Sequence, residues 1–111
     1  MNTDIKTELL EFIASWELDY IVSGGLPVTR MIITEHIGMD GKTYRKEIRK
    51  LKKEGLIRAV RVNIGDYFEE GSGLDIVGWE LTEKARNLEM MKRIKKEVEE
   101  RIKQVFGEEF V

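Results

Sequence analysis

The chain has 111 residues, of which 41% are hydrophobic and 36% charged, and this composition predicts one globular domain with a modest core. It contains no cysteine, which excludes disulfides and thiolate-ligated zinc or iron–sulfur sites. The first residues lack the basic and apolar segments of a signal peptide, and no apolar run is long enough to span a bilayer. We therefore expect a cytoplasmic protein with no membrane partner and no cofactor.

The formal net charge of −2 conceals a strong segregation of charge along the chain. Residues 41–61 hold nine basic and two acidic side chains, a formal charge of +7. Residues 1–40 carry −5, residues 62–83 carry −6, and residues 84–111 carry +2. Because the position of charges decides what they attract more than their sum does, residues 41–61 are the candidate surface for an anionic partner.

The N-terminal part of the chain predicts two helices separated by a short extended piece. Apolar residues at steps of four and three predict a first helix over about residues 3–20. A Ser-Gly-Gly run and Pro27 interrupt it, and residues 26–28 fit a minor edge strand. Thr29 is suited to cap a second, short helix that ends at Gly38.

The next predicted helix carries most of the basic residues. Asp40 is suited to cap it and Gly55 to end it. Tyr44, Ile48 and Leu51 recur at steps of four and three, so we expect these three side chains to face the core.

The C-terminal half predicts two strands and one further helix. Alternating apolar residues around 60–64 and 77–81 predict an antiparallel hairpin with a long loop. Thr82 is suited to cap a single final helix that runs to Gly107. The order of these elements predicts an α+β fold that is mainly α.

Two stretches of the sequence resemble winged helix-turn-helix transcriptional regulators. Residues 28–57, which close with Leu-Lys-Lys-Glu-Gly-Leu-Ile, resemble their helix-turn-helix and the entry into the wing. Residues 79–85, Trp-Glu-Leu-Thr-Glu-Lys-Ala, are similar to the strand-to-helix junction of the MarR and PadR groups, although Ala85 stands where those groups usually have glycine. The resemblance implies a winged helix-turn-helix with a two-stranded wing over residues 28–81 and a long C-terminal helix over residues 82–106. It also implies binding to double-stranded DNA in transcriptional regulation, with a recognition helix at about residues 41–54.

Helical geometry predicts the same DNA-binding surface independently of the resemblance. With Tyr44, Ile48 and Leu51 turned inward, the opposite side of the helix presents its cations and one threonine. A major groove admits such a helix, where Arg and Lys contact guanine edges and phosphates. The candidate DNA-binding residues are Lys42, Thr43, Arg45, Lys46, Arg49, Lys50, Lys53 and Arg61.

The apolar stripe of the last helix predicts a homodimer. It has near-heptad spacing and extends further than a small core needs, which favours a partner helix. The candidate dimerisation residues are Leu88, Met91, Ile94, Val98, Ile102 and Val105.

The loop between the two strands is acidic, and it leaves a second function open. It has four carboxylates and no cation over residues 66–75, so we expect the wing tip to point away from DNA or to bind a protein partner. Tyr67 and Phe68 are either anchors for such a partner or packed on the hairpin. The alternative function is accordingly a winged-helix module for protein–protein interaction without DNA binding.

Catalytic and metal chemistry are not expected. His36 is the only histidine, and the neighbouring carboxylate pairs are consecutive residues whose side chains diverge. We therefore expect neither an enzyme nor a metal site.

Overall fold

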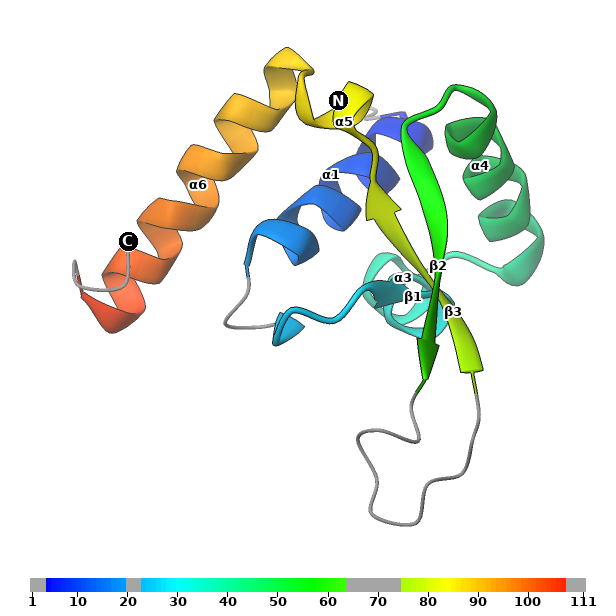
Figure 1. The fold of residues 1–111 in the computed structure, drawn as a ribbon, viewed down its shortest axis with the longest axis horizontal. Coiled ribbons are helices and arrows are strands. Elements are labelled where there is room, and N and C mark those ends of the chain that lie inside the picture. Colours follow the sequence, from blue (N-terminus) through cyan, green and yellow to red (C-terminus); the bar gives the residue numbers. More distant parts are fainter. Residues whose placement is uncertain (1–3, 20–22, 64–74, 108–111) are drawn as a thin grey trace, which may run out of the picture.

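The computed structural model describes residues 4–19, 23–63 and 75–107, and this part of the chain is mainly helical with a small antiparallel sheet (Figure 1). The α+β, mainly α prediction is confirmed at this level, as is the long helix near the C-terminus. The elements are α1 (Ile5–Leu18), β1 (Val28–Thr29), α3 (Arg30–Ile37), α4 (Gly41–Lys53), β2 (Ile57–Asn63), β3 (Asp75–Leu81), α5 (Glu83–Arg86) and α6 (Glu89–Phe106).

The sheet has three strands in the order β1-β3-β2, and every neighbouring pair is antiparallel. The predicted edge strand is present, because Val28 of β1 pairs with Trp79 of β3. The predicted hairpin is formed by β2 and β3 and begins at Ile57, earlier than the alternation indicated. Residues 64–74, which carry most of the predicted acidic wing tip with Tyr67 and Phe68, lie outside the described part of the chain.

The connection between α3 and α4 is a tight turn of residues 38–40. Gly38 ends α3 with a φ of 74°, a left-handed conformation that a residue with a side chain rarely adopts. Asp40 then caps α4, as predicted, because its carboxylate accepts the backbone N–H of Thr43 at 2.7 Å. Thr29 does occupy the N-cap of α3 but its side chain makes no capping hydrogen bond. It also belongs to β1, where it pairs with Gly78.

The core is built around α1, which lies between α4 and α6 and contacts both (Figure 1). Leu9 and Ile13 of α1 are completely buried and belong to the same cluster as residues of α3, α4, β3 and α6. The prediction that Tyr44, Ile48 and Leu51 face the core is confirmed. This packing leaves the opposite face of α4 at the surface.

The prediction of one final helix from Thr82 to Gly107 is wrong. Thr82 caps the short helix α5, its hydroxyl oxygen accepting the backbone N–H of Ala85, but the helix stops at Arg86. Asparagine competes with helical hydrogen bonding through its own side chain, and Leu88 after it is extended, with φ −70° and ψ 145°. The break lets α6 change direction and pack against α1.

The prediction that the apolar stripe of α6 extends further than the core of this chain needs is also wrong. Four of its residues are buried in the core of this same chain, and Leu88 is partly buried against it. Only Val105, which is 67% exposed, lies at the surface. The four buried residues are Met91, Ile94, Val98 and Ile102.

Ion pairs add to the contact between α1 and the C-terminal helices. Arg101 of α6 reaches the buried carboxylate of Asp19 at 2.8 Å, and Arg86 of α5 reaches Glu17 at 3.0 Å. The faces of α6 and α1 therefore fit one another in charge as well as in apolar surface.

Candidate nucleic-acid interface

The exposed face of α4 gathers basic side chains into one shallow surface depression. Helical spacing explains the grouping, because residues three and four apart lie on the same side of a helix. Every cation predicted on α4 lines this depression, namely Lys42, Arg45, Lys46, Arg49, Lys50 and Lys53. Thr43 is half-exposed in the first turn of the same helix.

Few acidic groups oppose this charge. Glu47, the one carboxylate within α4, is only 7% exposed and pairs with Lys50 at 3.3 Å. Glu54, at the end of the helix, pairs with Lys6 of α1 at 2.6 Å. Among the described residues, the cations of α4 that form no ion pair are Lys42, Arg45, Lys46, Arg49, Lys52 and Lys53.

The two arginines of β2 differ in their surroundings. Arg58 forms an ion pair with Glu80 of β3. Arg61 is exposed, and strand alternation places it on the same sheet face as Ala59, the partner of Trp79 in the register. Arg61 is not among the residues that line the depression on α4, so the sheet contributes it separately.

Tyr44 and Trp79 fix α4 against the sheet. The indole N–H of Trp79 donates a hydrogen bond of 2.7 Å to the hydroxyl oxygen of Tyr44. Burial raises the pKa of the Tyr44 phenol above its ordinary value of 10.0, against the opposing effect of the Trp79 hydrogen bond, so the hydroxyl stays neutral. The ammonium of Lys52 lies 5.5 Å from the centroid of the Trp79 ring, within cation–π range. Trp79 thus packs against the core and also borders the basic face.

Arg30 joins this region, although it is not one of the DNA-binding residues predicted from the sequence. It is the first residue of α3, is exposed, and places its guanidinium carbon 5.5 Å from the centroid of the Tyr44 ring. Arg30 lies within residues 1–40, whose net charge is negative, so the segregation of charge along the chain does not indicate it. Its position at the start of the helix before the basic helix is the one sequence feature that could have indicated it.

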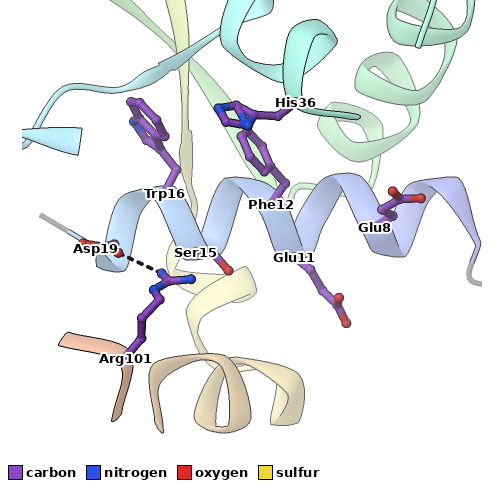
Figure 2. Close-up of a pocket in the computed structure, with 8 residues that line it drawn as sticks. All are labelled: Glu8, Glu11, Phe12, Ser15, Trp16, Asp19, His36 and Arg101. Carbon is purple, nitrogen blue, oxygen red and sulfur yellow. Dashed lines mark hydrogen bonds and ion pairs between the residues drawn. The ribbon is translucent and has the colours of Figure 1, made fainter. Parts of the chain in front are cut away.

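A second hollow, of ≈ 560 Å³, has a different character and none of its lining residues comes from α4 (Figure 2). Phe12 and His36 face one another there, with ring centroids 5.2 Å apart, beside Trp16. On the side toward α6, Asp19 pairs with Arg101. Within residues 4–19, 23–63 and 75–107, no three His, Asp or Glu side chains form a group that could hold a metal ion.

Comparisons with protein-family models, with curated proteins and with solved structures found no match to this chain. None of the helices in the described ranges combines the length and apolarity needed to cross a membrane.

Proposed function

We propose that this chain is a winged helix-turn-helix protein that binds double-stranded DNA in transcriptional regulation, with α4 as the recognition helix. The observation that carries the proposal is the exposed face of α4, where six cations line one depression and, among the described residues, only Lys50 of the six forms an ion pair, with Glu47 of the same helix. Binding of a polyanion to such a face is favourable, because each phosphate that a cation neutralises releases counterions into solution.

The arrangement of elements supports this proposal. A helix-turn-helix has two helices joined by a turn of three or four residues that often contains glycine. Here α3 and α4 are joined by residues 38–40, which begin with Gly38. The hairpin of β2 and β3 follows α4 directly and would be the wing.

The proposed roles follow from position on α4. Lys46 and Arg49 lie in the middle of the exposed face and would read base edges in the major groove. Cations nearer the ends of the helix would bind phosphates, as would Arg61 from the hairpin. The Tyr44–Trp79 hydrogen bond would keep the helix at a constant angle to the hairpin.

Binding to random-sequence duplex DNA, measured by fluorescence anisotropy over a range of salt concentrations, tests the proposal. We expect binding at low salt that weakens steeply as salt rises. The triple variant R45A/K46A/R49A should lose most of this affinity. A matched control, K92A/K95A/K96A, removes the same charge from exposed positions on α6, which lies on the other side of α1 from α4 (Figure 1), and should bind nearly as well as the wild type.

Two results would contradict the proposal. Equal affinity of the wild type and the α4 triple variant would mean that α4 is not the recognition helix. No detectable binding of the wild type at low salt would favour the alternative, a winged-helix module for protein–protein interaction.

A further inference from the structure

Gly41, the first residue of α4, leaves a space that the side chain of Arg30 enters and that of Arg45 borders. A Cβ atom at this position would lie 2.6 Å from Nη2 of Arg30 and 3.6 Å from Nη1 of Arg45. The two guanidinium groups come from different helices, α3 and α4, and approach the same point. Any side chain at Gly41 would displace the group from Arg30, since 2.6 Å is closer than two such atoms can approach.

The Arg30 guanidinium is held in place without a counter-charge. It lies over the ring of Tyr44, at 5.5 Å from the centroid, and Tyr44 is itself fixed by its hydrogen bond with Trp79. Among the described residues, neither Arg30 nor Arg45 forms an ion pair. The neighbouring carboxylate of Asp40 caps α4 through the backbone N–H of Thr43. It attracts Arg45 through the charge of the two groups but forms an ion pair with neither arginine.

Two converging guanidinium groups repel one another unless an anion lies between them. Guanidinium N–H groups match the oxygens of a phosphate in pairs, and Arg is favoured wherever phosphate is recognised in this way. A carboxylate of the same chain would neutralise the pair permanently, whereas a phosphate would do so only when bound.

We propose that Arg30 and Arg45 form a phosphate-binding site at the start of α4, opened by the absence of a side chain at Gly41 and positioned by the ring of Tyr44. The inference rests on the proposed DNA binding, where the ligand is a backbone phosphodiester at the edge of the groove that α4 enters. Free inorganic phosphate shares the same chemistry and is the other source of the anion. A contact of this kind is independent of base sequence.

The variant G41A tests the site with little risk to the fold. Gly41 does not have a positive φ, and alanine is more favourable than glycine in a helix. The added methyl group should displace the Arg30 guanidinium. We expect roughly a three- to tenfold loss of affinity for random duplex, similar for every sequence. The slope of log affinity against log salt concentration should become shallower by about 1, as expected for one lost phosphate contact.

The variant R30Q should have the same effect, and G41A/R30Q should bind no more weakly than R30Q alone because both changes act on one group. If the two losses add, Gly41 does not act through Arg30 and the proposed arrangement is wrong. If G41A and R30Q both bind duplex as tightly as the wild type while R45A/K46A/R49A does not, the DNA-binding function stands and the phosphate site fails.

Titration with inorganic phosphate, followed by the Nε–H signals of Arg30 and Arg45 in nuclear magnetic resonance spectra, identifies the source of the anion. Movement of both signals supports a site that accepts free phosphate, and movement with duplex alone supports one specific to the DNA backbone. If phosphate moves the signals but the wild type binds no duplex, the site stands and the proposed DNA binding fails. If neither phosphate nor duplex moves them, the site does not exist.

Discussion

Arg49 lies at the centre of the exposed face of α4 and forms no ion pair among the described residues. If it contacts a base, R49A should cost about 1–3 kcal/mol of binding free energy and relax the preference at one base pair. Competition among duplexes that differ at single positions, selected first from a random library, measures both effects. R58A is the matched control, since Arg58 is already paired with Glu80. A loss that is equal for all sequences would assign Arg49 to a phosphate instead.

Asp40 makes the stability of α4 depend on pH. The hydrogen bonds from Thr43, first from its backbone N–H and then from its side chain, hold the pKa of the Asp40 carboxyl below its ordinary value of 3.8. A carboxyl whose pKa is lowered by folding stabilises the fold at pH values above the ordinary one, and this contribution is lost as the pH falls through the lower, folded value.

The variant D40A should consequently melt at a lower temperature than the wild type at neutral pH, because the cap is lost. The difference between the two should shrink as the pH is lowered below the ordinary value of 3.8. Thermal unfolding followed by circular dichroism across the acid range measures it. E35A, at an exposed position of α3, is the control. A difference that stays constant down to acid unfolding would mean that the cap does not depend on the charge of Asp40.

Packing of α6 against α1 brings four buried residues of α6 into the common core. Ile94 is 2% exposed and belongs to the common core, so I94A should lower the free energy of unfolding by about 2–5 kcal/mol. V105A, at the exposed end of the same helix, should change it by no more than about 0.5 kcal/mol. Urea titrations at two protein concentrations provide the measurement. A loss that appears only at the higher concentration would mean that Ile94 is buried by a partner chain.

The parts of the fold that depend on neighbouring residues could be predicted from the sequence. The cap at Asp40, the inward side chains of Tyr44, Ile48 and Leu51, and the glycine stop at Gly38 all have signals within one or two helical turns. The same local spacing placed the exposed cations of α4 on one face, which is why most of the candidate site was found.

The parts that depend on distant residues could not be predicted. An apolar stripe shows that a helix face is buried but not what buries it, so α6 was assigned to a partner although α1 covers it. The place of Arg30 depends on the turn between α3 and α4, which brings it over Tyr44. The break at Asn87 has a weak local signal, because asparagine lowers helix propensity without forbidding a helix.

Homodimerisation is a prediction at the scale of the whole molecule. Since most of the α6 stripe is buried within the chain, truncation after residue 89 would remove core residues and would not test it cleanly. The exposed end of α6, at Val105, is the part of the predicted surface that a second copy could cover. We expect V105D to yield a monomer in light scattering, and Q104D, its exposed neighbour, to remain a dimer. A monomeric wild type at high micromolar concentration would contradict the homodimer.

The separation of charge within the chain also affects how it meets other molecules. With a net charge of −2 and six cations gathered in one depression on α4, the protein has an electric dipole. At low ionic strength, a polyanion exerts a torque on this dipole and turns α4 toward itself before contact. Near 0.15 M salt the field is screened within about 8 Å, so this rotation is confined to the last nanometre of approach. The fraction of collisions that begin in a productive orientation, and with it the association rate, is therefore set by ionic strength as well as by the contacts made afterwards.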